Sequence, residues 1–337
     1  MTLHSVLLAG LVWASGALAG YDPGSSDNIA IYWGQNSAGV SDQGNSQKSL
    51  GEYCSNTEVD IIPIAFLSSF NPIQVDLTNM GGNNDIGKEI SQCQAAGKTI
   101  LLSIGGATFN SAPSSPQQAQ EIADQIWSMF GPGTGDNRPF GQAVVDGFDL
   151  DIETPLQNLA PFAARLRENM DKANSAGGQK FYLSATPQCP YPDQNNKDIL
   201  QGDNEVAFDF IMVQFYNNPH GSNAGGFNMD QWDQWAHSSK NPKAKVFLGI
   251  PGGPTAVSPS QKESYKTPDK LAPIIAYSKQ FSSFGGVMIW DMSQVWANQG
   301  FLDGLASGIK GGASGNATAA VSEKTPTKRT HQRDWNL

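Results

Sequence analysis

The feature of this sequence that most constrains its fold is an alternation, repeated eight times, between a short apolar run and a helical pattern. The runs are rich in β-branched and aromatic residues and nearly continuously hydrophobic, as expected of parallel strands covered on both faces. They begin at Asn28, Val59, Lys98, Ala143, Lys180, Phe208, Ala244 and Gly285. Helical patterns cover residues 45–55, 85–96, 116–130, 156–173, 229–238, 268–280 and 300–309, and the pattern is least regular after the fifth run.

Eight β-then-α units over about 280 residues predict an α/β fold, a single (β/α)8 TIM barrel. The alternative is an open doubly wound sheet, which usually carries a glycine-rich phosphate-binding turn. No G-x-G-x-x-G follows the first run, so the barrel is favoured. In a barrel the carboxyl ends of all strands meet at one face, and functional side chains are expected there.

The N-terminal segment is typical of a secretory signal peptide. It has a short polar start, an apolar run from Val6 to Trp13 and the small residues Ala17-Leu18-Ala19. A membrane anchor is the alternative, but the apolar run is too short to span a bilayer. We therefore expect a signal over residues 1–19 and a secreted, extracellular protein.

The C-terminal segment differs from the rest of the chain because it lacks apolar periodicity. Residues 311–337 are expected to form a disordered polar tail, which leaves residues 20–310 as the folded domain. The tail contains the sequon Asn316-Ala317-Thr318, so Asn316 is a candidate glycosylation site.

Charge and residue counts exclude several classes of partner. The chain carries 31 acidic and 21 basic residues, and an acidic body does not attract phosphate backbones, so no nucleic acid partner is expected. No stretch after the signal is apolar enough to span a membrane. The histidines lack metal-ligand spacing, so we expect no metal and no cofactor. The three cysteines, Cys54, Cys93 and Cys189, leave one unpaired, and spacing alone does not choose the pair. A monomer is the default expectation.

The stretch "VVDGFDLDIETP" places several acids where a buried strand is expected. Side chains alternate along a strand, so Asp149, Asp151 and Glu153 share one face while apolar residues share the other. Inside a barrel mouth these carboxyls cannot all be ionised, so at least one should have a raised pKa and could act as a general acid. The alternatives are a structural ion-pair network or a divalent-metal site. No Lys or Arg interleaves on this strand, and no further ligands are grouped nearby.

Several motifs resemble glycoside hydrolase family 18. "DGFDLDIE" is similar to the family signature D-G-x-D-x-D-x-E, and "LLSIGG" resembles its S-x-G-G motif on the third strand. "YWGQN", "QFYNNP" and "GGVMIW" resemble the plant-type, class III chitinases that are also found in fungi. The resemblance runs from about Asn28 to Ile309.

The resemblance implies a role for each residue of the acidic strand. Glu153 matches the acid that protonates the glycosidic oxygen, and Asp151 the residue that orients the N-acetyl group of the substrate. Asp149 matches an inner partner that shares a proton with Asp151. Tyr216 matches the tyrosine that holds the acetamido carbonyl. The implied reaction is retaining and substrate-assisted, through an oxazolinium ion, because this family uses the substrate in place of a carboxylate nucleophile.

The same resemblance implies a set of substrate-binding residues. Gln214 and Asn217 match polar groups of the subsite, Trp290 matches the floor beneath the sugar, and Tyr32 matches a first-strand contact. Many relatives carry Met-x-Tyr-Asp where this chain has Gln214-Phe215-Tyr216-Asn217, which agrees with the plant-type branch. The expected partners are chitin and chitin oligosaccharides, cleaved at β-1,4 N-acetylglucosamine linkages.

The resemblance also bears on the loops and the cysteines. Only about 35 residues separate the seventh and eighth runs, too few for the α+β insertion domain of deep-tunnel chitinases, so an open groove and endo cleavage are expected. Cys54 and Cys93 match a bridged pair. Cys189 matches a cysteine whose usual partner falls near His220 and is absent here, so it should be a free, buried thiol.

Two other functions fit the same fold. An endo-β-N-acetylglucosaminidase acting on glycoprotein glycans would share the acids and differ in its loops. A non-catalytic chitin-binding lectin or an inhibitor protein would typically lose the acid or block the groove, whereas the four acid and tyrosine positions are intact here. A serine hydrolase is disfavoured because the chain has no G-x-S-x-G elbow.

Overall fold

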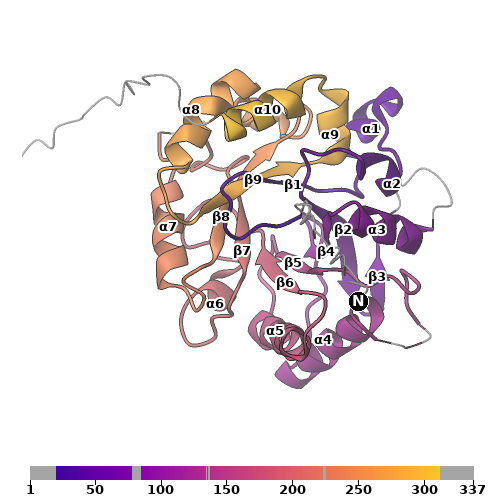
Figure 1. Cartoon of the computed structure of the whole chain (residues 1–337). Coiled ribbons are helices and arrows are strands. Elements are labelled where there is room, and N and C mark those ends of the chain that lie inside the picture. Colours follow the sequence, from indigo (N-terminus) through magenta and orange to yellow (C-terminus); the bar gives the residue numbers. More distant parts are fainter. Residues whose placement is uncertain (1–19, 78–84, 134, 136, 223–224, 312–337) are drawn as a thin grey trace, which may run out of the picture.

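The computed structural model describes residues 20–77, 85–133, 135, 137–222 and 225–311. Figure 1 looks along a central ring of strands with helices around it. The predicted signal at residues 1–19, the candidate sequon at Asn316 and the predicted tail beyond Gly311 lie outside the described residues.

Eight parallel strands form a closed barrel, as predicted. They are β1 (Asn28–Ile31), β2 (Ile61–Phe70), β4 (Thr99–Gly105), β5 (Gly147–Asp151), β6 (Tyr182–Ala185), β7 (Phe210–Gln214), β8 (Lys245–Pro251) and β9 (Phe284–Trp290). The sheet order runs β1-β9-β8-β7-β6-β5-β4-β2, and β1 also pairs with β2, which closes the ring. The sequence analysis did not predict β3 (Ile73–Val75), which pairs antiparallel with β2.

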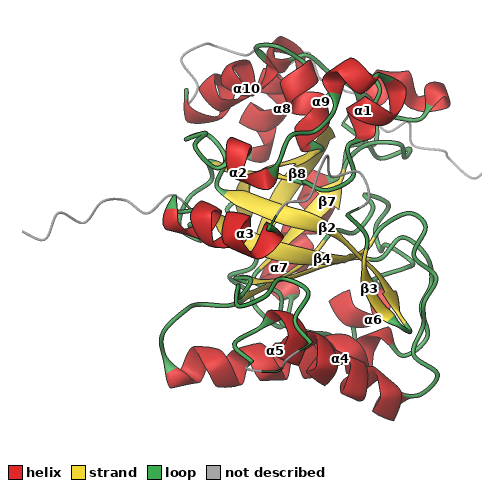
Figure 2. Cartoon of the chain, turned by 90° about the vertical axis from the view of Figure 1, so that its right-hand side faces the viewer, coloured by secondary structure: helices red, strands yellow, loops and turns green. Residues whose placement is uncertain are grey.

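Helices surround the barrel on all sides, as Figure 2 shows for α4 and α5 on one side of the strands and α8 to α10 on the other. The predicted ranges agree closely with α3 (Ile86–Ala95), α4 (Pro116–Phe130), α7 (Met229–Ser238), α8 (Pro268–Ser278) and α10 (Phe301–Lys310). Helix α5 (Leu159–Ala176) begins and ends three residues later than predicted.

The prediction of one helix over residues 45–55 was wrong. Within that range only α2 (Leu50–Tyr53) is an α-helix, and it is preceded by the short elements α1 (Ser37–Ser41) and η1 (Gln43–Asn45). Between β6 and β7, a stretch that the structure describes in full, the only helix is α6 (Lys197–Leu200). Between β8 and β9 lie only η2 (Pro259–Ser264) and α8, without an α+β insertion, and α9 (Met292–Ala297) follows β9.

Two apolar layers hold the barrel together. The larger one lies between strands and helices and includes Phe148 and Leu150 of β5. The smaller one fills the barrel interior, where Tyr21 packs against Phe210 at a centroid distance of 4.4 Å and against Tyr182 at 5.1 Å. Tyr21 also has its main-chain N–H bound to Thr99 Oγ1 at the amino ends of the strands. These aromatic rings form a packed floor at the amino ends of the strands.

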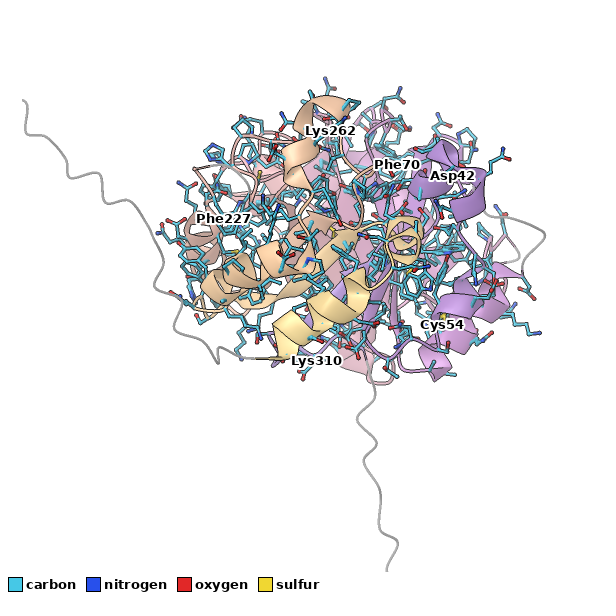
Figure 3. The ribbon with its side chains drawn as sticks, turned by 90° about the horizontal axis from the view of Figure 1, so that it is seen from above. Asp42, Cys54, Phe70, Phe227, Lys262 and Lys310 are labelled. Carbon is cyan, nitrogen blue, oxygen red and sulfur yellow. A yellow bond between two sulfur atoms is a disulfide. The ribbon has the colours of Figure 1, made fainter. Side chains whose placement is uncertain are left out.

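The barrel axis stands upright in Figure 3, where Asp42, Phe70 and Lys262 lie in the upper half and Cys54 and Lys310 in the lower half. The first three follow or end β1, β2 and β8, so the upper face holds the carboxyl ends of the strands. This is the face at which functional side chains were expected.

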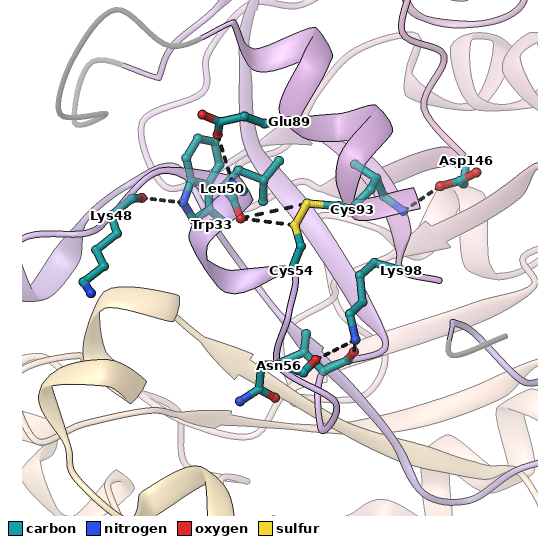
Figure 4. The surroundings of a disulfide bond; sticks show 12 residues. Trp33, Lys48, Leu50, Cys54, Asn56, Glu89, Cys93, Lys98 and Asp146 are labelled. Atoms are coloured by element: carbon teal, nitrogen blue, oxygen red, sulfur yellow. Dashed lines mark hydrogen bonds between the residues drawn. A yellow bond between two sulfur atoms is a disulfide. The ribbon is translucent and has the colours of Figure 1, made fainter. Parts of the chain in front are cut away.

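Cys54 and Cys93 form the predicted disulfide, which joins α2 to α3 across 39 residues. Figure 4 shows both sulfur atoms beside the main-chain oxygen of Leu50. Cys189 is a free, fully buried cysteine, also as predicted. Burial raises the pKa of its thiol to about 12, so it is unreactive at neutral pH.

None of the helices in the described part of the chain is both long and apolar enough to cross a bilayer.

Asp60, at the amino-end face, provides a test of how stability depends on pH. Its Oδ2 accepts a hydrogen bond from the main-chain N–H of Ile29 at 2.8 Å. Burial raises the pKa of Asp60 to about 6, against the opposing effects of that hydrogen bond and of Lys98 and Lys310. The folded chain therefore keeps this proton at pH values where the unfolded chain has lost it. The resulting stabilisation is complete below about pH 4 and is lost as the pH rises through about 6.

Asp60→Asn removes this titration while the amide oxygen can still accept from Ile29. The free energy of unfolding of the variant, relative to the unmodified protein, should rise by about 2–3 kcal/mol between about pH 4 and pH 7. Urea unfolding of both proteins at the two pH values measures the difference. A difference that does not change with pH would contradict the prediction.

Candidate active site

The acids of β5 point into the barrel as their alternation predicts. Phe148, Leu150 and Ile152 join the outer apolar layer. Asp149 and Asp151 are buried on the inner side, and Glu153 follows just after the strand end. A fourth acid of the same stretch, Asp146, lies at the opposite end of the strand. Its two oxygens accept from Gln94, Gln179 and the main-chain N–H of Ile100, so it is structural.

Asp149 is fully buried inside a cage of hydroxyl groups. Its Oδ2 accepts from Ser103 Oγ at 2.6 Å and from Tyr32 Oη at 2.7 Å. Its Oδ1 accepts from Ser184 Oγ at 2.7 Å and from Thr186 Oγ1 at 3.0 Å. Burial raises the pKa of Asp149, and these four donors oppose the rise. In the described residues no hydrogen bond joins Asp149 to Asp151, because the hydroxyls already occupy both oxygens.

Asp151 and Glu153 meet at the side chain of Gln214. Nε2 of Gln214 lies 3.1 Å from Asp151 Oδ1 and 3.5 Å from Glu153 Oε1, and it also faces the main-chain oxygen of Thr186 at 3.2 Å. One amide nitrogen thus faces both carboxyls, which brings them close together. Two adjacent buried carboxyls cannot both ionise without strong repulsion, so the pair holds a proton to higher pH than either would alone.

The surroundings favour the protonated form of this pair. Burial raises the pKa of Asp151 well above its usual range, and the negative charges of Glu153, Asp149 and Asp193 raise it further. Burial also raises the pKa of Glu153, Gln214 opposes the rise, and the charge of Asp193 adds to it. Among the described residues that line this cavity, none is Lys or Arg, so no positive side chain offsets these effects.

The acids open into a cavity of about 260 Å³ at the carboxyl ends of the strands. Its lining consists of Tyr32, Gln35, Phe66, Gly106, Ala107, Thr108, Asp151, Glu153, Thr186, Gln214, Tyr216, Asn217, Ala256 and Trp290. The rings of Phe66 and Trp290 stack with a centroid distance of 5.8 Å and an interplanar angle of 16°, and Tyr32 packs against Trp290 at 5.5 Å. An aromatic wall therefore faces the carboxyls across a space large enough for one sugar ring.

Tyr216 is buried, yet its hydroxyl has no hydrogen-bond partner among the described residues. The side chain lines the cavity beside the two carboxyls. Burial raises the pKa of Tyr216 well above its usual range, and the negative charges of Asp151 and Glu153 raise it further. The Tyr216 hydroxyl therefore remains a neutral donor. A phenolic hydroxyl that lines a cavity and has no protein partner can donate to a ligand oxygen there.

Steric contacts explain why the last two positions of the S-x-G-G motif are glycines. Gly105 and Gly106 both have positive φ angles, of 128° and 90°. A Cβ at Gly105 would lie 2.0 Å from the main-chain oxygen of Asp151, and one at Gly106 would lie 2.8 Å from the ring of Phe66. The motif therefore allows β4 to approach the end of β5 closely, next to the acids.

The structure brings the predicted site residues together. Seven of the eight line the cavity, and Asp149 lies beneath them. Tyr32 contributes its ring to the lining, while its hydroxyl is used by Asp149. The main-chain N–H of Asn217 donates to Ser264, and its Oδ1 accepts from the N–H of Ser258, which fixes an exposed residue with a φ of 57°.

The sequence analysis missed several residues of this region. Gln35, Phe66 and Thr186 line the cavity, and Ser103 and Ser184 form part of the cage around Asp149. Period-two alternation could have indicated Ser184 and Thr186, which share the inner face of the fifth strand and its continuation. No comparable signal exists for Phe66, because β2 changes register next to it.

The family model described as "Glycosyl hydrolases family 18" matches residues 28–264, which include every predicted catalytic and substrate-binding residue except Trp290. The chain belongs to glycosyl hydrolase family 18. Among curated family 18 relatives, endochitinase 33 of Trichoderma harzianum is 41% identical over 319 residues, covering 87% of this chain and 95% of the relative.

Solved structures similar to this family 18 chain include both an enzyme and an inhibitor. The ICChI chitinase of Ipomoea carnea is 28% identical with a TM-score of 0.67, covering 83% of this chain and 99% of the other. A xylanase-A-amylase inhibitor protein, XAIP-III, is 31% identical with a TM-score of 0.68, covering 83% and 98%. These likenesses confirm the predicted barrel.

Proposed function

We propose that this family 18 chain is a secreted endochitinase that cleaves β-1,4 linkages between N-acetylglucosamine units with retention of configuration. The observation that carries the proposal is the pair Asp151 and Glu153, held by one amide, opposite an aromatic wall and an unpaired tyrosine hydroxyl. The name of the endochitinase 33 relative supports chitin as the substrate.

In the proposed reaction Glu153 is the general acid. It gives its proton to the glycosidic oxygen as the bond from that oxygen to the anomeric carbon breaks. The raised pKa of Glu153 supports this role, because the carboxyl then holds its proton to a higher pH than an ordinary glutamate does. The half-buried position of Glu153 at the cavity wall leaves it accessible to a substrate.

The acetamido oxygen of the substrate is the proposed nucleophile. It attacks the anomeric carbon and forms an oxazolinium ion, so no protein carboxylate needs to bond to the sugar. Asp151 stabilises the positive charge on the acetamido nitrogen, and the Tyr216 hydroxyl donates to the acetamido oxygen. Water then attacks the same carbon, gives its proton to Glu153 and restores the acid. Asp149 supports Asp151 from beneath, in an orientation that the hydroxyl cage fixes.

The aromatic wall is the proposed floor of the sugar-binding subsite. Trp290 would stack on the apolar face of the sugar, with Tyr32 packed against it. Gln214 and Asn217 would contact polar groups of the same sugar. The short connection between β8 and β9 is consistent with an open groove that accepts the middle of a chain, which supports endo cleavage.

The remaining parts of the proposal concern the whole chain. We propose that residues 1–19 direct secretion, that residues 20–310 form the catalytic domain, and that residues 311–337 are a polar tail with a candidate sugar attachment at Asn316. We propose that the protein acts as a monomer on chitin, without a nucleic acid or membrane partner.

The likeness to inhibitor proteins makes a non-catalytic role the second candidate. Such a protein would bind sugars or another enzyme without turning over chitin. The unpaired Tyr216 hydroxyl and the paired carboxyls favour the enzyme, because binding alone does not require a proton donor beside a second acid.

The test is proton NMR of a chitin hexasaccharide digest, following the anomer formed at early times. Early β-anomer with tetramer and dimer products is the expected result, from retention and mid-chain cleavage. Early α-anomer would mean inversion and would remove the roles proposed for Asp151 and Tyr216. Absence of products while the sugar still binds would favour the non-catalytic candidate.

A further inference from the structure

The loop over residues 188–196 follows β6 and contributes no residue to the cavity lining. It carries Asp193, Asn195 and Asn196, three residues with no role in the proposed reaction. Asp193 and Asn196 are buried, with 4% and 0% exposure. Buried polar side chains are costly unless they are paired, so their contacts indicate what the loop does.

Two amide side chains of this loop hold the main chain of β5 beyond its end. Nδ2 of Asn195 donates to the main-chain oxygen of Glu153 at 2.9 Å, and Nδ2 of Asn196 donates to that of Ile152 at 2.9 Å. The ladder between β5 and β6 ends at Leu150. The loop amides therefore replace the missing strand pairing where the catalytic acid sits.

Asp193 in turn holds the loop in this arrangement. Its Oδ1 accepts from the main-chain N–H of Asn195 at 2.9 Å. Its Oδ2 accepts from Nδ2 of Asn196 at 2.8 Å and from the main-chain N–H of Gln188 at 2.9 Å. All three donors are neutral, and no cation is paired with Asp193 in the described residues. A neutral acceptor could make most of these bonds without the cost of burying a charge, so the structural role alone does not account for a carboxyl here.

We propose that Asp193 is a positioning residue of the catalytic site, which holds the loop amides that fix the main chain at Glu153 and places a buried acid beside the pair Asp151 and Glu153. This inference rests on the proposed function. It adds a buried acid, outside the cavity, that sets the pH range in which the pair can act.

The groups that face Glu153 agree with this assignment. Asp151 comes from β5 with Asp149 behind it, Tyr216 follows β7, and Asp193 follows β6, so the titratable groups around the pair are acids and one neutral phenol. Burial also raises the pKa of Asp193 itself, against the hydrogen bonds from Asn195, Asn196 and Gln188. Burial is the largest cause of the raised pKa of both Asp151 and Glu153, and Asp193 raises both. Removing its charge should therefore move both ionisations of the pair in the same direction, to lower pH.

The test compares pH profiles of kcat/KM for the unmodified protein, Asp193→Asn and Asn195→Ala. In Asp193→Asn the side-chain amide oxygen can keep the contacts with Gln188 and Asn196, and only the contact with the Asn195 N–H is lost. Asn195→Ala breaks the link to the Glu153 carbonyl without changing charge, which makes it the matched control. The substrate is an unmodified chitin oligosaccharide, because an activated aryl leaving group would not need the acid.

We expect both limbs of the Asp193→Asn profile to move to lower pH. On the alkaline limb its kcat/KM, relative to its own optimum, should fall about three- to tenfold below that of the unmodified protein. Asn195→Ala should lower kcat by a similar factor at every pH and leave the limbs in place. An Asp193→Asn profile that coincides with the unmodified one after scaling would overturn the inference.

Two further variants ensure that every outcome of the test either supports or refutes the inference. If Asp193→Asn does not fold, Asp193→Ser replaces it, because a serine hydroxyl can accept the same N–H two residues on. Glu153→Gln is measured alongside. An active unmodified protein, an inactive Glu153→Gln and an unshifted Asp193 variant would refute this inference alone. An inactive unmodified protein would refute the proposed function and this inference with it.

Discussion

Replacing Glu153 with glutamine should lower kcat for chitin oligosaccharide hydrolysis by about 10²- to 10⁴-fold, because the amide cannot give or take the catalytic proton. Glutamine has nearly the same size, and it relieves the repulsion between Glu153 and Asp151. Binding of the oligosaccharide should therefore be retained within a few fold. Product analysis gives the rate, and isothermal calorimetry with a chitin tetrasaccharide gives the affinity.

Glu121→Gln is the control for this measurement. Glu121 is an exposed residue of α4 whose side chain accepts a hydrogen bond from Gln117 on the same helix, so the substitution removes the same charge outside the cavity lining. It should leave both kcat and affinity unchanged. If Glu153→Gln retained kcat within tenfold, the assignment of Glu153 as the acid would be wrong.

Removing the disulfide should have the largest effect on stability. The bond closes a loop with a sequence separation of 39 residues, and loop-closure entropy for that length corresponds to about 4 kcal/mol. The double variant Cys54→Ala with Cys93→Ala should lose about this much free energy of unfolding, in addition to lost packing. Urea unfolding of the oxidised proteins measures it.

Cys189→Ala separates packing from cross-linking, because Cys189 is equally buried and closes no loop. Twice the free energy of unfolding lost in Cys189→Ala estimates how much of the double variant's loss comes from packing. Dithiothreitol should destabilise the unmodified protein and leave the double variant unchanged. If the double variant lost no more than twice the Cys189→Ala value, the bridge would contribute nothing beyond packing.

The barrel was predictable because its signal is local. Each buried strand is a short apolar run, and the alternation in "DGFDLDIE" assigns Asp149 and Asp151 to the inner face without knowledge of their neighbours. Helices α4 and α7 have clear boundaries in the sequence, and their predicted ranges agree with the structure residue for residue. The roles of Tyr216 and Trp290 came from family resemblance, because a tyrosine or tryptophan at a strand end is ambiguous alone.

The cage around Asp149 was not predictable because it depends on register. Ser103, Asp149 and Ser184 are direct partners across three neighbouring strands. A shift of one residue between strands would remove these contacts, and nothing in a single sequence fixes that register. The prediction of a helix over residues 45–55 was wrong for a related reason. The short helices after β1 are set by packing of α1 against α9, more than 250 residues later, rather than by a local apolar period.

The hydroxyl cage also limits how this enzyme can be made more robust. Its donors come from β1, β4 and the β6 end, so the polar layer that supports the acids is also what connects these strands across the barrel centre. If apolar side chains replaced the hydroxyls of that layer, the buried carboxyl of Asp149 would lose its hydrogen-bond donors. Removing Asp149 as well would take away the support of Asp151. Substitutions in the middle of the barrel therefore cannot raise stability without lowering catalytic activity. Stabilising substitutions should be sought at the aromatic floor and among the outer helices, where packing can be improved without touching the chemistry.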